Sequence, residues 1–125
     1  DTFPYTGGTT IKHALWMGVP VITLAGLRRS ERGGTANLAR IGLDDWSVTS
    51  TDAYVGQAIR AAGDLAALAE IRAALRGRIA DSPLRQASSV ARSLEYAFRV
   101  MWQRWCMGQP PAAFDVTLEQ ALQRP

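Results

Sequence analysis

Residues 19–24 constrain the fold more than any other segment of this chain. The run is apolar and rich in β-branched residues on both faces, a pattern typical of a parallel strand buried on both sides of a sheet. Gly18 and Pro20 mark the end of a short helix before it. The apolar side of that helix contains Ile11, Ala14, Leu15 and Trp16. Loop, helix, turn and strand in this order form half of an α/β unit, so the sequence predicts an α/β fold.

Another helix and a short strand are expected next. Residues 31–41 are predicted to form a helix of small residues that Gly42 ends, and a strand follows at residues 46–48. Either Ser50 or Thr51 can cap the helix after that strand. Apolar residues recur there at helical spacing: Tyr54, Val55, Ala58 and Ile59.

Two longer helices complete the predicted elements. The first begins after a cap at Asp64 and has an apolar stripe at three- and four-residue spacing, made of Leu65, Leu68, Ile71, Leu75 and Ile79. The second, at about residues 88–107, has a broad apolar side with Leu94, Phe98, Met101, Trp102 and Trp105. Such a wide aromatic face indicates packing against a partner domain that lies outside this chain.

The basic balance of the chain does not indicate nucleic-acid binding. The formal charge is +3, and Lys12 is the only lysine among 14 Lys and Arg residues. Arg28, Arg29 and Arg32 are the closest cluster, but the chain has no run of five or more like charges. A solvated loop is favoured over a phosphate clamp for these three arginines. We therefore expect no nucleic-acid partner.

Cysteine and histidine are too scarce for a metal site made by the protein. Cys106 is the single cysteine and His13 the single histidine, so no set of zinc ligands is expected, and a reducing compartment fits the cysteine content. No apolar run approaches the ~20 residues that would span a bilayer. We expect no metal, no membrane and a cytoplasmic location.

The loop at residues 6–10, Thr-Gly-Gly-Thr-Thr, can hold a phosphate at the start of the first helix. Two glycines let the backbone approach an anion, first-turn N–H groups point toward it, and Thr9 and Thr10 can donate from their hydroxyls. The same residues also form an ordinary turn with a helix cap, in which Thr9 or Thr10 caps the first turn. Loop chemistry alone favours this second interpretation.

A longer string gives weight to the phosphate interpretation. The segments DTFPYTGGTT at residues 1–10 and ALWMGVPV at residues 14–21 closely resemble bacterial O-GlcNAc transferase-like and SPINDLY-like glycosyltransferases. The resemblance continues more loosely to about residue 115, through residues 32–36, 65–79, 82–84 and 95–102.

The resemblance implies a GT-B enzyme with two Rossmann-like lobes, usually joined to tetratricopeptide repeats. This chain would be the second half of the nucleotide-sugar-binding lobe with its C-terminal helix at residues 1–107, followed by a tail at residues 108–125. The donor diphosphate would meet Gly7, Gly8, Thr9 and Thr10. His13 stands where relatives commonly have an aspartate that binds the donor ribose, and it is either a ribose contact or a solvent-facing helix residue.

The activity that the resemblance implies is transfer of N-acetylglucosamine from UDP-GlcNAc to Ser or Thr of proteins, without a metal or other cofactor. Its partners would be a nucleotide-sugar, protein acceptors, an N-terminal catalytic lobe and tetratricopeptide repeats. Catalytic residues are expected upstream of this chain, which we expect to be an inactive fragment of a longer bacterial protein. The alternatives are a SPINDLY-like protein O-fucosyltransferase that uses GDP-fucose, a degenerate non-catalytic scaffold module, or a small nucleotide-binding regulator.

Several other residues are expected to be structural. The tryptophans Trp16, Trp46, Trp102 and Trp105 are predicted to pack in the core or between domains rather than to bind sugars. Asp44 and Asp45 are adjacent in a turn, where they are expected to separate a helix from a strand rather than to act in acid–base chemistry. Lys12 is predicted to be a solvated charge or a secondary phosphate contact, and Cys106 a helix-packing thiol.

Overall fold

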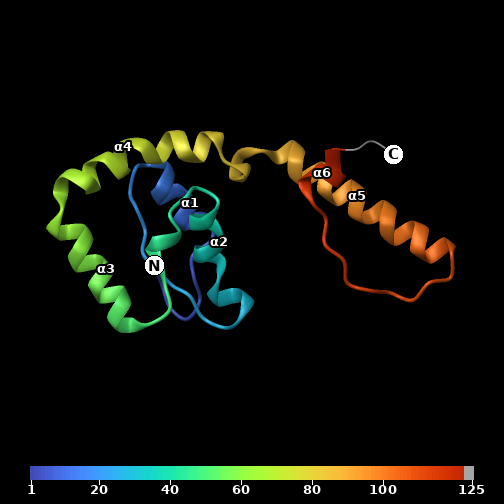
Figure 1. The fold of residues 1–125 in the computed structure, drawn as a ribbon, viewed down its shortest axis with the longest axis horizontal. Helices are drawn as coiled ribbons and strands as arrows, with labels where there is room; N and C mark the ends of the chain where they lie inside the picture. The colour runs from blue at the N-terminus through green and yellow to red at the C-terminus, as the bar shows by residue number, and fades with distance from the viewer. Residues whose placement is uncertain (123–125) are drawn as a thin grey trace. The chain divides into compact units, whose positions relative to one another are not determined.

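Two short parallel strands organise the first of two compact units in the computed structural model, which describes residues 1–122 (Figure 1). The units comprise residues 1–85 and the residues from 86 onward. In the first unit β1 (Thr23–Leu24) pairs with β2 (Ser47–Val48), Thr23 opposite Ser47 and Leu24 opposite Val48. Both strands lie inside the predicted runs, and helices surround them. The predicted α/β class is confirmed.

The helix before β1 begins and ends where local signals place it. Helix α1 (Thr9–Trp16) buries Ile11 and Leu15. Gly18 follows with a φ of 73°, a backbone conformation that side chains other than glycine rarely adopt. The Gly18 N–H donates to the carbonyl of Leu15 at 3.0 Å and closes the last turn. The predicted end of this helix is confirmed.

The helix predicted at residues 31–41 is shorter than expected. A 3-10 turn, η1 (Arg29–Glu31), comes first, and α2 (Gly33–Ala39) follows it. The side chain of Glu31 accepts a hydrogen bond from the Arg28 N–H at 3.0 Å, which holds the tighter turn. Gly42, with a φ of 67°, lies beyond the helix end, as predicted. A second 3-10 turn, η2 (Asp44–Trp46), leads into β2.

The two helices after β2 have the predicted caps. Ser50 accepts from the Ala53 N–H at 3.2 Å and caps α3 (Thr51–Gly63). Asp64 accepts from the Ala67 N–H at 2.9 Å and caps α4 (Leu65–Asp81), which the 3-10 turn η3 (Pro83–Arg85) follows. Both caps form because each side chain is one residue before the first turn.

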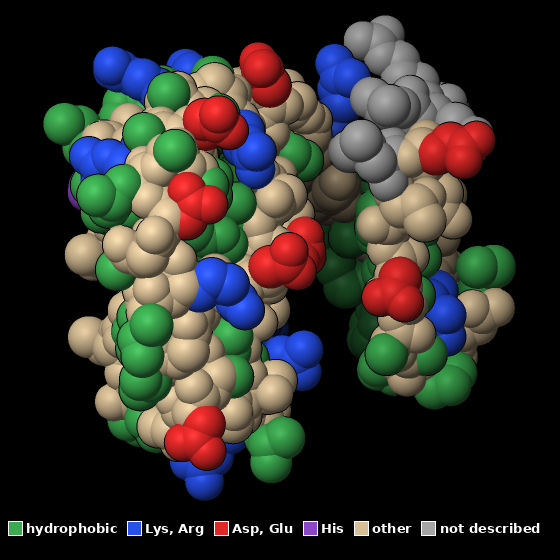
Figure 2. Space-filling view, turned by 60° about the vertical axis from the view of Figure 1, so that its left-hand side comes forward, with side chains coloured by type: hydrophobic (Ala, Val, Ile, Leu, Met, Phe, Trp, Pro, Cys, Tyr) green, Lys and Arg blue, Asp and Glu red, His purple; other side chains and the backbone are tan. Residues whose placement is uncertain are grey.

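The core of the first unit lies where α1, α2 and α4 meet. One leucine of each helix is fully buried, Leu15, Leu38 and Leu75. Of the predicted α4 stripe, Leu75 and Ile79 are buried, whereas Leu65 is exposed. The apolar residues expected on α3 do not form a core face: Val55 and Ile59 are exposed, and Gln57 is the buried residue of this helix. Figure 2 shows hydrophobic side chains on the surface among charged ones.

The second unit consists of α5 (Ala87–Cys106) and the short α6 (Leu118–Leu122), which contact each other. The predicted long helix is confirmed to within one residue at each end. No residue of α5 is buried, and its apolar side is open at Leu94, Phe98, Met101, Trp102 and Trp105. Helix α6 lies in the segment expected to be an irregular tail, of which residues 123–125 lie outside the described residues. The expected division at residue 107 stays a prediction.

Candidate functional site

The carboxylate of Asp1 holds the loop that precedes α1. Oδ1 accepts hydrogen bonds from the backbone N–H groups of Thr2 at 2.8 Å and Gly7 at 2.9 Å. Oδ2 accepts from the Thr23 hydroxyl at 2.7 Å, and Thr23 is fully buried in β1. The backbone nitrogen of Asp1 also donates to the Ile22 carbonyl at 3.0 Å. The Asp1 side chain therefore joins the loop, through Oδ1, to the strand, through Oδ2.

Thr6 ties the same loop to the segment that follows β1. Its N–H and its hydroxyl both donate to the Ser30 carbonyl, each at 3.2 Å. The hydroxyl in turn accepts from the Gly34 N–H at 3.3 Å. Thr6 is buried, so its polar groups are satisfied within the protein. It positions the loop and is not open to a ligand.

The two glycines of the loop differ in their surroundings. A Cβ on Gly7 would lie 3.1 Å from Ile11 Cγ1 and 3.2 Å from Asp1 Oδ1, so a side chain there would crowd the helix and the carboxylate. A Cβ on Gly8 would have nothing within 4 Å. Gly7 is therefore a packing glycine, whereas Gly8 leaves open space before the first turn of α1.

Thr9 and Thr10 begin α1 rather than cap it. The residue at the cap position is Gly8, and no side chain among the described residues caps the helix. The expectation that a threonine caps this helix is wrong, because Thr9 is already the first helical residue and the cap position falls on Gly8, which has no side chain. The first N–H groups of any α-helix lack partners within it. Both threonines are exposed, so the first turn of α1 presents uncapped N–H groups beside two hydroxyls.

His13 lies one turn further along α1 and is exposed. Its side chain and that of Lys12 line a pocket of about 270 Å³ with Trp16, Ile79, Leu84 and Arg85. The loop glycines and the two threonines are not among the lining residues. The structure thus brings Gly7, Gly8, Thr9 and Thr10 together and leaves His13 on a neighbouring surface.

Trp16 packs against cationic side chains. The guanidinium carbon of Arg76 lies 4.8 Å from the centre of its ring, and that of Arg85 lies 5.1 Å away. These distances are typical of cation–π contacts. A ring covered in this way is a packing residue that fastens α1 to α4 and η3, as predicted.

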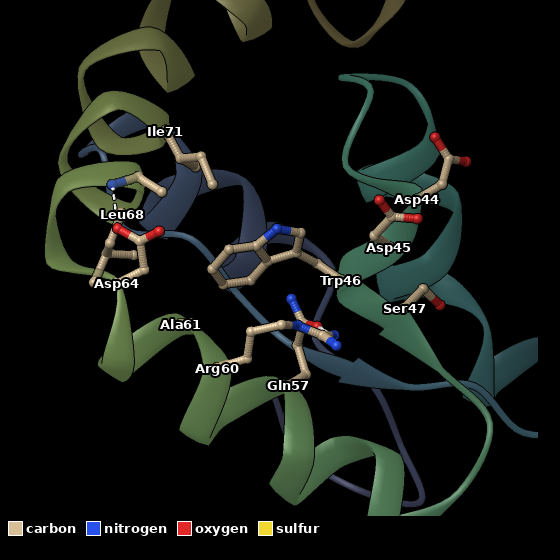
Figure 3. Close-up of a pocket in the computed structure, with 11 residues that line it drawn as sticks. Asp44, Asp45, Trp46, Ser47, Gln57, Arg60, Ala61, Asp64, Leu68 and Ile71 are labelled. Carbon is tan, nitrogen blue, oxygen red and sulfur yellow. Dashed lines mark hydrogen bonds between the residues drawn. The ribbon is translucent and has the colours of Figure 1, made fainter.

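A pocket of about 750 Å³ lies at the beginning of β2 (Figure 3). Trp46 lies between Leu68 and Ile71 of α4 and the pair Gln57 and Arg60 of α3. Trp46 is 7% exposed and Gln57 is 5% exposed. Arg60 donates to the amide oxygen of Gln57. Trp46 is thus a core residue, as predicted.

Asp44 and Asp45 lie on the rim of the same pocket and belong to η2, between α2 and β2. This is the separating position that the sequence predicts. No group of three or more His, Cys, Asp or Glu residues that could hold a metal ion occurs within residues 1–122. Within the same residues, no helix is both long and apolar enough to cross a bilayer.

Comparison with known proteins decides the family. The model of glycosyl transferase family 41 matches residues 1–94. The chain belongs to glycosyl transferase family 41. The matched residues include the Asp1 loop, all of α1 and both strands, so the geometry described above is part of the family 41 region.

Curated relatives of this family 41 chain include plant proteins. It is 43% identical over 120 residues to the probable UDP-N-acetylglucosamine–peptide N-acetylglucosaminyltransferase SPINDLY of Oryza sativa subsp. japonica, covering 96% of this chain and 13% of that protein. It is 32% identical over 126 residues to the probable N-acetylglucosaminyltransferase SEC of Arabidopsis thaliana, covering 100% of this chain and 13% of that protein. The chain therefore spans about an eighth of these relatives.

A solved structure has the same fold. A mutant of the O-GlcNAc transferase of Thermobaculum terrenum matches with a TM-score of 0.79 and 36% sequence identity. The match covers 86% of this chain and 21% of that one. The resemblance to O-GlcNAc transferase-like and SPINDLY-like proteins is thereby confirmed, and the roles of individual residues stay predictions.

Sequence reasoning missed the role of Asp1 and Thr6 in this family 41 chain. Their neighbours Gly7 and Gly8 were identified as a ligand loop, but the groups that position the loop were not. Asp1 stands at the start of the loop, and its partner Thr23 is 22 residues away. The one available signal was an acidic residue before a glycine loop in an α/β pattern. This signal does not show that Thr23 is the hydrogen-bond partner of Asp1.

Proposed function

We propose that this chain is the donor-diphosphate-binding part of a protein O-GlcNAc transferase. The observation that carries the proposal is the uncapped first turn of α1, at Gly8, Thr9 and Thr10, within a family 41 chain. The similar proteins whose names include N-acetylglucosaminyltransferase support UDP-GlcNAc as the donor. The full protein would be a GT-B enzyme whose N-terminal lobe and repeats lie outside this chain.

In the proposed reaction the hydroxyl oxygen of an acceptor Ser or Thr attacks the anomeric carbon of the sugar. The bond from that carbon to the diphosphate oxygen breaks, and UDP leaves with the electron pair. The proton of the hydroxyl passes to a base outside this chain. The α1 N–H groups and the hydroxyls of Thr9 and Thr10 would stabilise the negative charge that grows on the leaving diphosphate. No metal is required in this proposal.

The geometry supports this role in two ways. Asp1 and Thr6 use their polar groups to hold the loop, so the loop is positioned before a ligand arrives. Gly8 leaves the space in front of the helix open. A preorganised and open helix N-terminus is suited to a phosphate.

We also propose that α5 packs against another part of the full-length protein. Its apolar side is exposed along the helix, at Leu94, Phe98, Met101, Trp102 and Trp105. Exposed apolar patches of this kind mark interaction sites. Relatives are several times longer than this chain and offer the surface that would cover it.

Transfer of fucose from GDP-fucose is the alternative. Similar plant proteins named SPINDLY are 37–43% identical to the chain, whereas the similar protein of Arabidopsis thaliana named SEC is 32% identical. The resemblance to SPINDLY-like proteins implies GDP-fucose as the donor in this alternative. A degenerate scaffold remains the second alternative, because His13 replaces the aspartate expected at the ribose.

Isothermal calorimetry of UDP and GDP with the full-length protein tests these possibilities. We expect UDP to bind and the double variant Thr9→Ala, Thr10→Ala to bind it at least about tenfold more weakly, since each lost hydrogen bond to a charged phosphate is worth about 1.5–3 kcal/mol. Ser88→Ala is the matched control, because Ser88 is an exposed hydroxyl in the first turn of α5. A preference for GDP would favour fucosyl transfer, and failure of both nucleotides to bind would favour the scaffold.

A further inference from the structure

A cavity of about 780 Å³ lies beside the proposed donor loop. It is formed by the loop after β1, by η1 and by the segment between β2 and α3. We call it the arginine pocket, lined among others by Phe3, Leu24, Leu27, Arg28, Arg32 and Ser50. The third arginine of the cluster, Arg29, is not one of its described lining residues. The three loops around it lie together at the lower end of the first unit in Figure 1.

We propose that the arginine pocket binds an acidic side chain of the acceptor protein, near the hydroxyl that is modified. This inference rests on the proposed function, since it presumes a polypeptide acceptor. It adds a preference for acceptor segments that contain Asp or Glu. Arg28 and Arg32 were expected to be solvated loop residues. In the structure both line the same pocket.

The two guanidinium groups are available for a ligand. Within residues 1–122, Arg28 and Arg32 form hydrogen bonds through their backbone atoms only. Glu31 also lines the pocket, but its carboxylate accepts from the Arg28 N–H at 3.0 Å and folds over Gly26, where a Cβ would overlap with it. One oxygen of the acidic group among the described lining residues is thus held by the backbone, and Arg28, Arg32 and Glu31 together leave a net charge of +1. Planar guanidinium groups pair with carboxylates through two parallel hydrogen bonds.

The start of α3 adds to the positive potential. Thr51, the first residue of this 13-residue helix, and its cap Ser50 both line the pocket. The N-terminal end of a helix has a partial positive charge. Asp52 in the same first turn offsets part of this charge, so Arg28 and Arg32 supply most of the attraction for an anion in the pocket.

The position and the apolar rim favour an acceptor peptide over the donor or a free anion. Parallel strands bind their ligands at their carboxyl ends, and the pocket lies at the carboxyl ends of β1 and β2. The donor loop is directly adjacent, because Thr6 donates to Ser30 and Phe3 lines the pocket. Leu27 is 97% exposed and Phe3 is 61% exposed, so the rim offers apolar contacts that a peptide can use.

The test measures transfer of N-acetylglucosamine from UDP-GlcNAc by the full-length protein. Two short serine peptides of equal length are compared as acceptors. One peptide has Glu residues around the serine, and the other has Gln at the same positions. In the double variant Arg28→Ala, Arg32→Ala we expect the KM for the Glu peptide to rise about tenfold, because a charge-assisted hydrogen-bonded pair is lost. The KM for the Gln peptide and the KM for the donor should stay unchanged. The control Arg29→Ala removes one positive charge next to the pocket and should leave the KM for both peptides unchanged.

Three results would overturn the proposal: equal loss for both peptides, no loss for either, or a rise in the KM for the donor instead. If the wild-type protein transfers N-acetylglucosamine to neither peptide and binds no UDP, the proposed function fails. Fluorescence anisotropy of the labelled Glu peptide then tests the pocket by itself. Weaker binding to the double variant than to Arg29→Ala would support the pocket, and equal binding would refute it.

Discussion

The carboxylate of Asp1 accepts a hydrogen bond from the Thr23 hydroxyl, with 2.7 Å between Oδ2 and Oγ1. The same carboxylate accepts from the Gly7 N–H at 2.9 Å. Asp1 therefore links a fully buried strand residue to the loop in front of α1. The proposed diphosphate site depends on this link, because it decides where Gly8 and the first turn lie relative to β1.

Thr23→Val should weaken UDP binding by the full-length protein. Valine keeps the shape of threonine but removes the hydroxyl that donates to Asp1, which costs about 1–3 kcal/mol where a partly buried acceptor is left unsatisfied. Calorimetry with UDP measures the effect. Thr35→Val is the matched control, because the Thr35 hydroxyl pairs with the Ser47 hydroxyl at 2.7 Å away from the loop. Equal loss of affinity in both variants would contradict the prediction.

Gly7→Ala should lower the thermal stability of the protein, whereas Gly8→Ala should change it little. The new Cβ at residue 7 would lie 3.1 Å from Ile11 Cγ1, and relieving such overpacking typically costs about 1–3 kcal/mol. The new Cβ at residue 8 meets nothing within 4 Å. Melting temperatures followed by circular dichroism compare the two. A larger shift for Gly8→Ala would show that the packing argument is wrong.

His13→Asp should strengthen UDP binding if the side chain at this position contacts the ribose. A carboxylate offers two acceptor oxygens where a neutral imidazole offers one acceptor nitrogen, and one more hydrogen bond to a charged group is worth about tenfold in affinity. Lys12→Gln is the control on the same helix, as both side chains line the same pocket. An unchanged dissociation constant for UDP in His13→Asp would contradict a ribose contact at residue 13.

The double variant Trp102→Ser, Trp105→Ser should reduce the resistance of the full-length protein to proteolysis. Trp102 is 65% exposed and Trp105 is 76% exposed on α5, so their loss removes little packing within the described residues. Destabilisation would come from the proposed contact with another part of the protein. Arg99→Ser on the same helix is the control. Digestion rates like those of the control would argue against that contact.

Helix ends were predictable because their causes are local. Gly18 and Gly42 adopt positive φ, and Ser50 and Asp64 accept hydrogen bonds from residues three positions ahead. These effects involve neighbours in the chain, so the sequence contains all of their partners. The start of α1 was misjudged because two adjacent threonines follow Gly8, and a shift of one residue decides whether a hydroxyl caps the helix or lies within it.

Contacts between distant segments were not predictable. Gln57 is buried and Val55 is exposed on the same helix, since α3 turns Gln57 toward Trp46. Arg28 and Arg32 line one pocket, although helical or strand periodicity does not set them apart from Arg29. Which residues are buried or line a pocket depends on the surface that each element packs against. The pattern of hydrophobicity along the chain does not predict that surface.

The sequence by itself determined the α/β class, the order of the elements and the glycine-threonine loop at the start of α1. These follow from periodicity, caps and backbone preferences, all of which act over a few residues. Only the tertiary structure decided that Asp1 and Thr23 meet and that the cap position falls on Gly8. The physical reason is that hydrogen bonds between β1 and the loop join groups 22 residues apart, whose approach is set by core packing.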